Sequence, residues 1–501
     1  MNEKSRLTMR VAGVAVLLGI WGDALLRALP WGLNLFLWTA VALLSFLLLS
    51  GHRDKDFDKS EVAVLAIILV FAAGFAWRDS AAIKALNLLA MLVGISAWAL
   101  TLEDVRLRAW GLLDYLRGMV NSFGAAAFGA TTLAGAEVTR ELAPSSTRLR
   151  QARSLALGLL IALPLLFVFG GLLMAADAVF DRMVSTALNF DFANLFSHAA
   201  LAALLSWLAC GFLLLTLRAV RPTISGAFDI ARPGLGLVEV GVPLLLIDLL
   251  FLAFVVIQLR YLFGDTSLVQ NTVGLTYSEY ARRGFLELVA VAALVLPLLL
   301  AADWMISTAE HRSQYVFRIL AGVQISLLFI IMVSALKRMM LYQGAYGLTE
   351  LRLYATAFMG WLGAVLLWFA ATVLRGRREP FLAGAVLAGL LLISGLNFLN
   401  PDALITRLNS ERARAGAEFD PYYASSLSGD AVSTLVSALH MLDPDDRCIV
   451  AARLLDRWEA PQLSDWRSWN LGRTQARRAV AEANQQLQEI QCRPPAGSAA
   501  G

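Results

Sequence analysis

Residues 381–399 read FLAGAVLAGLLLISGLNFL and carry no charged side chain. As a helix, a run of about twenty apolar residues is long enough to cross the roughly 30 Å hydrocarbon core of a bilayer. Apolar and polar residues do not alternate in it, as they would in a barrel strand. Because only helices and closed barrels satisfy their backbone hydrogen bonds in lipid, the stretch predicts a membrane-spanning helix.

Similar runs recur along the first four hundred residues. The chain is 58% hydrophobic and 16% charged, whereas soluble domains are roughly 25% charged. We therefore predict an all-α, polytopic transmembrane helix bundle of about eleven spans, followed by a C-terminal helical extramembrane tail. The other ten predicted spans are residues 11–29, 31–49, 61–77, 82–102, 154–176, 195–217, 238–259, 285–306, 316–336 and 353–374.

The predicted spans divide the chain into five parts. These parts are spans 1–4 in residues 1–102, an amphipathic connection in 103–153, spans 5–11 in 154–399, a helical tail in 400–493 and a disordered end in 494–501. The connection has an apolar stripe at helical spacing, formed by Leu112, Tyr115, Leu116, Met119 and Phe123. Two interpretations stay open for it: a helix in the lipid headgroup region, or a helix packed against the inner ends of the bundle.

The distribution of Lys and Arg predicts the orientation, because short basic loops are retained in the cytoplasm. With the N-terminus inside, 21 of these residues fall in inner segments and 10 in outer ones, and 11 belong to the tail. We therefore expect a multi-pass protein of the bacterial inner membrane with a cytoplasmic N-terminus and an extracytoplasmic C-terminus.

Charge and motifs exclude several functions. A net charge of +4 is too small to indicate a nucleic-acid partner. The sequence contains no phosphate-binding loop of the GxxxxGK[ST] type, no HExxH and no GxSxG. We expect no catalytic residue, no metal site and no cofactor, so the protein is not predicted to be an enzyme.

Asp248 is the candidate intramembrane polar site, because it lies near the middle of the predicted span 238–259. An ionised carboxylate there costs about 3 kcal/mol on insertion scales. It either binds a proton or cation in a transport pathway or is a protonated carboxyl bonded to a neighbouring helix. Four other acids lie nearer span ends and are interpreted as structural: Asp23, Asp177, Glu287 and Asp303.

The tail contains further polar residues and two of the three cysteines. Asp402, Asn409, Asp420 and Asp430 match no tight metal-binding loop, so we expect them to cap helices and form turns. Asp443 followed by Pro444 predicts a helix start, and residues 473–490 predict a final helix. Cys448 and Cys492 are expected to form a disulfide in an oxidising compartment, with two unpaired thiols as the alternative.

Several short motifs resemble a known bacterial family. Two Gly-Leu-Thr segments each lead into a predicted span, and Asp-Pro-Tyr-Tyr, Ser-Gly-Asp and Trp-Arg-Ser-Trp-Asn follow in the tail. The motif residues are Gly274, Thr276, Tyr277, Tyr280, Arg282, Tyr346, Gly347, Thr349, Arg352, Asp420, Tyr423, Asp430, Trp466 and Asn470. In this order they resemble the membrane family catalogued as domain of unknown function 4173. The resemblance implies a multi-pass membrane protein and no activity.

Two functions remain after these exclusions. A non-catalytic scaffold or envelope-assembly partner fits a large bundle with few buried charges and a folded outer tail. The alternative is a secondary transporter or channel that uses Asp248. The expected partners are the lipid bilayer and an unidentified membrane or envelope protein.

Overall fold

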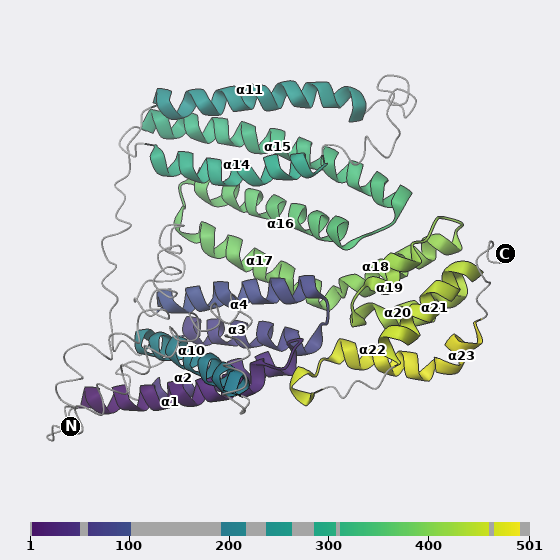
Figure 1. Cartoon of the computed structure of the whole chain (residues 1–501). Coiled ribbons are helices and arrows are strands. Elements are labelled where there is room, and N and C mark those ends of the chain that lie inside the picture. Colours follow the sequence, from purple (N-terminus) through teal and green to yellow (C-terminus); the bar gives the residue numbers. More distant parts are fainter. Residues whose placement is uncertain are drawn as a thin grey trace, which may run out of the picture.

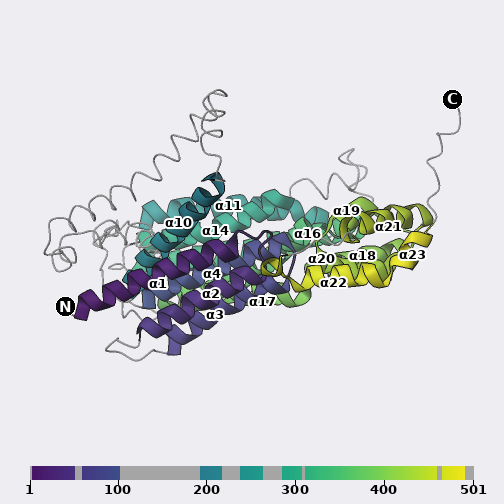
Figure 2. The same cartoon turned by 60° about the horizontal axis from the view of Figure 1, so that its bottom comes forward.

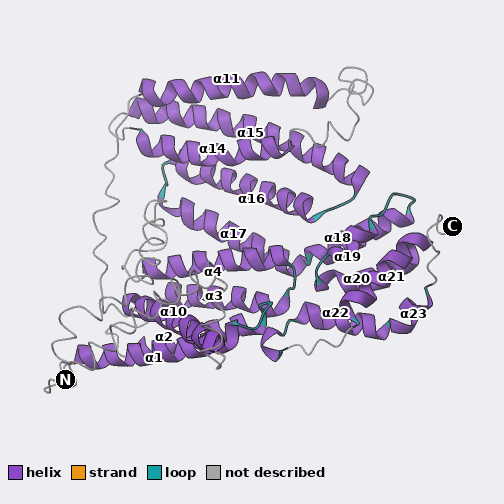
Figure 3. Cartoon of the chain, viewed as in Figure 1, coloured by secondary structure: helices purple, strands orange, loops and turns teal. Residues whose placement is uncertain are grey.

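The computed structural model describes residues 3–50, 59–101, 192–216, 237–262, 285–306, 311–459 and 465–490. Within these ranges every regular element is a helix (Figure 3). Ten of the described helices are long and apolar enough to cross a membrane. The predicted all-α polytopic bundle is confirmed. Each predicted span except 154–176 coincides with one of these helices, and that span lies outside the described residues.

The spanning helices run roughly parallel or antiparallel to one another (Figure 1). They are α1 Glu3–Leu26, α2 Leu33–Ser50, α3 Lys59–Trp77, α4 Ala81–Thr101, α10 Phe192–Thr216, α11 Leu237–Leu262, α14 Phe285–Met305, α15 His311–Tyr346, α16 Glu350–Thr372 and α17 Glu379–Leu399. A short 3₁₀ turn, η2 Val373–Arg375, follows α16. α15 has 36 residues and is longer than the predicted 316–336, so it extends beyond the bilayer thickness.

The spanning helices pack around two apolar cores. One core joins α1–α4 with α10, and the other joins α11, α14, α15 and α16. α17 belongs to both: Phe381 and Ala385 pack in the second core, and Ile393 packs in the first. The last span therefore holds the two halves of the bundle together, as its place between them in Figure 1 shows.

The outward faces of these helices are apolar. Leu48, Leu250 and Leu294 are among the large hydrophobic side chains that stay exposed, at 65–72% of their surface. A soluble protein would leave few such contiguous apolar surfaces in water. Lipid covers them in a membrane, so the same residue types are used on the inner and outer faces of each helix.

The C-terminal helices gather at one end of the bundle (Figures 1 and 2). They are α18 Pro401–Arg414, α19 Pro421–Ser426, α20 Gly429–Ala438, η3 Leu439–Met441, α21 Pro444–Trp458, η4 Trp466–Ser468, α22 Leu471–Glu482 and α23 Asn484–Glu489. Their own core includes Val450, Leu454, Trp458 and Val480. Val450, Leu454 and Trp458 recur every four residues, which places them on one face of α21.

Two local expectations in the tail are refined. Asp443 does precede the first turn of α21 with Pro444 at its start, but its side chain makes no capping hydrogen bond. The final helical segment begins earlier than expected, at Leu471, and is interrupted at Ala483, after which α23 begins at Asn484.

Candidate functional site at the junction of bundle and tail

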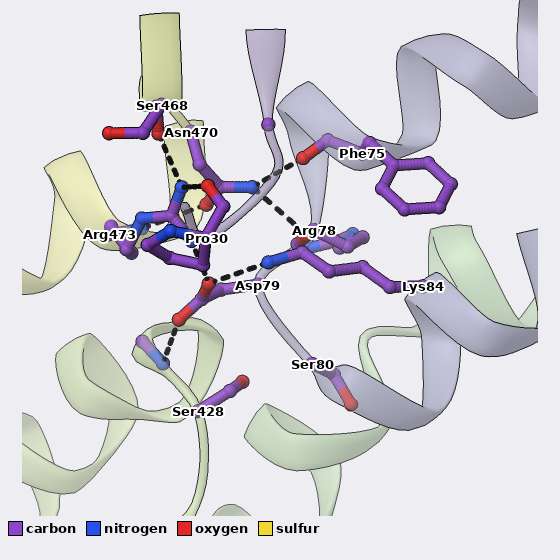
Figure 4. Close-up of polar contacts among 12 residues, drawn as sticks. Pro30, Phe75, Arg78, Asp79, Ser80, Lys84, Ser428, Ser468, Asn470 and Arg473 are labelled. Carbon is purple, nitrogen blue, oxygen red and sulfur yellow. Dashed lines mark hydrogen bonds and ion pairs between the residues drawn. The ribbon is translucent and has the colours of Figure 1, made fainter. Parts of the chain in front are cut away.

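The candidate site is a partly buried polar cluster where the tail meets the turn between α3 and α4 (Figure 4). We call Arg78, Asp79, Lys84, Asp430 and Arg473 the junction cluster. The first three come from the membrane bundle, and the last two come from α20 and α22. Charged groups from residues about 350 to 400 positions apart therefore meet in one buried place.

Asp79 is the centre of the junction cluster. One of its carboxylate oxygens accepts hydrogen bonds from Lys84 Nζ at 3.0 Å and from Arg473 Nη1 at 2.6 Å. The other oxygen accepts the backbone N–H of Gly429 at 3.1 Å. Burial alone would raise the pKa of Asp79, but the two cations outweigh it and hold the pKa below its usual value. Asp79 is therefore a largely buried carboxylate, its side chain 12% exposed, with a partner on both sides of the junction.

Asp430 makes the reciprocal contact from the tail. Its Oδ2 accepts the backbone N–H groups of Asp79 at 2.6 Å and of Ser80 at 3.0 Å. These N–H groups belong to the two residues just before α4, which begins at Ala81, so they have no partner within that helix. Burial raises the pKa of Asp430, and the two backbone donors and Arg78 offset that rise only in part. A tail carboxylate thus binds the turn that leads into a membrane helix.

Asn470 binds the other side of the turn between α3 and α4. Its Nδ2 donates to the carbonyl oxygens of Phe75 at 2.8 Å and Arg78 at 2.9 Å, which belong to the end of α3. Its Oδ1 accepts the N–H of Arg473 at 3.1 Å and so caps the start of α22. One side chain that is 1% exposed therefore satisfies the end of one helix and the beginning of another.

A second contact joins the tail to the turn between α15 and α16. Gly347 has a φ of +77°, a left-handed conformation that glycine adopts without strain. Asn409 of α18 accepts the N–H of Leu348 at 2.7 Å and donates to the carbonyl of Leu348 at 2.8 Å. The Tyr423 hydroxyl accepts the N–H of Glu350 at 2.8 Å and so satisfies a donor at the start of α16.

A third contact joins the tail to the turn between α1 and α2. The N–H of Leu33 donates to the carbonyl of Trp469 at 2.8 Å. A side chain at Gly32 would place its Cβ 2.3 Å from that same carbonyl oxygen, so the approach requires glycine. Arg467 also donates to the carbonyl of Ala24. Together the three contacts fix the tail to the turns after α1, α3 and α15.

Three buried oxygens near the junction cluster have no hydrogen-bond partner within the described structure: Asp402 Oδ1, Ser80 Oγ and the Tyr354 hydroxyl. Ser80 lies near both of the other two side chains, but neither pair meets the geometry of a hydrogen bond. The other oxygen of Asp402 accepts the N–H and the hydroxyl of Ser428. Burial raises the pKa of Asp402, and the Ser428 donors do not cancel the rise.

Within the bundle, next to the junction cluster, two buried asparagines form hydrogen bonds to each other. Asn87 Nδ2 donates to Asn397 Oδ1 at 3.1 Å, and Asn397 Nδ2 donates to Asn87 Oδ1 at 2.7 Å. Arg78 Nε donates to the backbone carbonyl of Asn397 at 2.7 Å. These contacts connect α4 with α17, and therefore tie the turn at Asp79 to the last span.

The intramembrane acids lie in different surroundings. Asp248 on α11 is 4% exposed, and neither of its carboxylate oxygens has a partner among the described residues. Asp23 is paired with Arg27 at 2.7 Å and with His198 Nδ1 of α10 at 2.5 Å. Asp303 is paired with Arg378 at 2.8 Å. Asp177 and the side chain of Glu287 lie outside the described residues.

Other sequence-predicted features lie partly or wholly outside the described residues. These are the amphipathic connection 103–153, the first Gly-Leu-Thr segment with Gly274, Thr276, Tyr277, Tyr280 and Arg282, and Cys492. Cys210 is a free, buried thiol, whereas Cys448 is disulfide-bonded. Because Cys492 is not described, the pairing of Cys448 with Cys492 stays a prediction.

The described motif residues meet along the junction. Asp430 and Asn470 bind the turn at Asp79, and Tyr423 binds the start of α16. Arg352 donates to the carbonyls of Tyr346 and Gly347, with Thr349 next to it at the start of α16. Asp420 caps α19 through the N–H of Tyr423, and Trp466 is exposed.

Sequence reasoning missed the bundle side of the junction cluster, namely Arg78, Asp79 and Lys84, and it missed Arg473. A signal was present, because Arg78 and Asp79 lie between two apolar spans without a long loop to keep them in water. Charges in so short a connection require partners from elsewhere in the chain when they are buried.

A family model catalogued as a domain of unknown function, DUF4153, matches residues 65–438. This match covers more than half of the chain. The chain belongs to the DUF4153 family. The resemblance to domain of unknown function 4173 is therefore wrong. Its motifs are short turn and helix-start sequences, and such sequences recur wherever a helix must begin, so they do not separate one membrane family from another.

The region matched by the DUF4153 model includes Asp79, Asp402 and Asp430 but ends before Asn470 and Arg473. No curated protein and no solved structure is significantly similar to the chain. In the described part of this DUF4153 protein, no group of three or more His, Cys, Asp or Glu side chains is arranged to hold a metal ion. The junction contacts are suited to fixing two parts of the chain together.

Proposed function

We propose that this protein is a non-catalytic membrane scaffold that holds its C-terminal helices in a fixed position on the membrane surface for assembly with an envelope or membrane partner. The observation that carries the proposal is the junction cluster, in which Asp79, Asp430 and Arg473 are each bonded across the boundary. Buried ion pairs require defined geometry, so they favour one orientation over a freely hinged tail.

The orientation that we propose places the tail outside the cytoplasm of a bacterial cell, with the N-terminus inside. The tail contacts the turns after α1, α3 and α15 and continues directly from α17. All four places belong to outer segments in the count of Lys and Arg. Their common contact with one domain supports the alternation of inner and outer segments on which that count depends.

The course of α10 supports the predicted number of spans. His198, near its beginning, pairs with Asp23 at the tail end of α1, and Phe212, near its end, contacts Trp98 at the far end of α4. Thr101 and Phe192 therefore lie at opposite faces of the bundle. One further crossing between them, as predicted for residues 154–176, fits this arrangement.

A second candidate function, transport of a proton or cation, is favoured by Asp248. Its two buried oxygens have no partner among the described residues, and the cost of an ionised carboxylate in lipid requires compensation. Val240, Leu244 and Val255 lie on the same face of α11 and are buried in the core shared with α15. A proton or a small cation would neutralise the carboxylate there.

Complementation of a deletion strain separates the two functions. We expect Asp430→Ala to impair complementation, because it removes the hydrogen bonds of the tail to Asp79 and Ser80, and Asp248→Asn to preserve it. Asp445→Ala is the matched control, since Asp445 is an exposed acid of the tail. The abundance of each variant in the membrane is measured in parallel. Loss of complementation by Asp248→Asn at normal abundance, with Asp430→Ala active, would support transport and refute the scaffold.

A further inference from the structure

A cavity of about 220 Å³ lies at the end of the bundle remote from the tail. Its polar lining consists of Asp303 at the end of α14, Gln314 and Arg318 in the first turns of α15, and Gly376 and Arg378 after η2. Buried apolar groups from Ile306, Phe317 and Val373 complete the wall. The cavity is therefore bounded by the ends of several spanning helices and is both basic and apolar.

Among the described side chains, the charges around this cavity are mostly positive. Arg378 binds Asp303 at 2.8 Å and neutralises it. The Arg318 guanidinium reaches to within 3.2 Å of the position that a Cβ on Gly376 would occupy, so it lies over the glycine turn. Arg375 and Arg377 are exposed in the same turn. Asp303 is the single carboxylate among the described side chains that line the cavity.

The depth of the cavity indicates where its ligand comes from. α14 ends at Met305, α16 at Thr372, and α17 begins at Glu379, so these residues mark the level at which the helices leave the hydrocarbon. Figure 1 shows these helix ends at the side of the bundle away from α18–α23. Lipid headgroups lie at this level. A soluble ion from bulk water would not require a binding site with an apolar wall.

We propose that this cavity binds the phosphate of an anionic phospholipid. The Arg318 guanidinium presents several N–H donors in one plane, a geometry that matches two oxygens of a phosphate. Arg375 and Arg377 add positive charge around it, and basic pockets between spanning helices bind such headgroups in membrane proteins. Ile306, Phe317 and Val373 close the inner wall of the cavity. The lipid site is independent of the scaffold function.

The test uses the full-length protein, purified in a neutral detergent, and measures binding of short-chain phosphatidylglycerol by native mass spectrometry. Phosphatidylcholine is the neutral comparison lipid, and inorganic phosphate is the soluble comparison ligand. Arg318→Gln is expected to weaken phosphatidylglycerol binding about tenfold, because a charge-assisted pair is lost. Arg318→Lys keeps the positive charge but lacks the planar arrangement of N–H donors. Its affinity for phosphatidylglycerol is expected to lie between those of the wild type and Arg318→Gln.

Arg312→Gln is the matched control, since Arg312 is exposed on the same helix but six residues away and does not line the cavity. It is expected to change binding less than twofold, as a surface charge does. An equal loss of phosphatidylglycerol binding in Arg312→Gln and Arg318→Gln would overturn the proposed site. Equal affinity of the wild type for phosphatidylcholine and phosphatidylglycerol would also overturn it. Binding of inorganic phosphate without binding of phosphatidylglycerol would overturn the lipid as the ligand. Circular dichroism establishes that each variant is folded.

Discussion

At the scale of single residues, Asp79 shows how a charge is kept inside the protein. Two cations and a backbone N–H surround it, and they come from both sides of the junction. Removing one partner of a buried pair leaves the other charges uncompensated, which costs more than the pair itself contributes. Asp79 therefore compensates the charges of Arg473 and Lys84, and these two cations compensate the charge of Asp79.

We expect Asp79→Asn to lower the free energy of unfolding at neutral pH by about 3 kcal/mol. Because the pKa of Asp79 is lowered in the folded state, its contribution is complete above its ordinary pKa and disappears as the pH falls through the folded value. The difference between variant and wild type should shrink in acid. Denaturant unfolding of the purified protein at several pH values measures it, with the exposed Asp445→Asn as control; equal stability at pH 7 would contradict it.

Asp402 has the opposite effect on the pH dependence of stability. Its pKa is raised by burial, so the unfolded chain loses this proton at a lower pH than the folded chain. The free energy of unfolding therefore falls as the pH rises from the ordinary pKa of this carboxyl through its pKa in the folded state. Above the folded-state pKa the full destabilisation is present. Asp402→Asn cannot ionise and keeps an acceptor for Ser428, so it should be more stable than wild type at pH 8 and indistinguishable at pH 4.

Unfolding of Asp402→Asn at these two pH values tests the prediction. Glu418→Gln, which removes an exposed acid from the same domain, provides the control and should follow the wild type at both values. A variant that is less stable at pH 8 would show that the Asp402 carboxylate has a compensating partner.

At the scale of elements, the helix ends are the most informative part of the fold. Asn470 joins the end of α3 to the start of α22, and Asp430 covers the start of α4. The tail thus supplies hydrogen-bond partners that the turns between spans cannot supply themselves. Each contact replaces water at a place where two helices come together.

Asn470→Asp is isosteric but cannot donate to the carbonyls of Phe75 and Arg78. We expect it to destabilise the protein by about 2 kcal/mol, the cost of leaving buried acceptors without donors. The reverse exchange Asp420→Asn is the control, because Asp420 is exposed and only accepts a hydrogen bond, from the N–H of Tyr423. The control should change stability by less than about 0.5 kcal/mol. Similar losses in the two variants would mean that the amide donors of Asn470 contribute little.

Much of this element-level structure follows from sequence. Apolar runs of spanning length predicted α17 and the other described spans, because lipid leaves helices almost no alternative. Asp-Pro at residues 443–444 correctly marked the start of α21. The cross-domain contacts could not be predicted in the same way. Nothing local to Asn470 indicates that its amide bonds to a residue 395 positions earlier, and a single sequence carries no record of such pairs.

For the protein as a whole, the proposed orientation in the membrane predicts where fused reporter proteins are active. We expect green fluorescent protein fused after Gly501 to be dark when exported unfolded, and alkaline phosphatase fused there to be active, because the tail is predicted to lie outside. The same reporters fused after Ser50, in a predicted inner loop, should give the opposite result. Fluorescence at Gly501 would invert the proposed topology, although the tail would still contact the same three turns.

The junction also sets the order in which the protein can be completed during synthesis. When the turn with Asp79 is synthesised, its partners Asp430 and Arg473 are still about 350 to 400 residues from being made. α17, which closes both cores, is the last span to enter the membrane. Ribosomes add about 5–20 residues per second, so the turn at Asp79 waits for tens of seconds without its partners from the tail. A chain that stops before α20 lacks every tail partner of that turn, which distinguishes an unfinished molecule from a finished one.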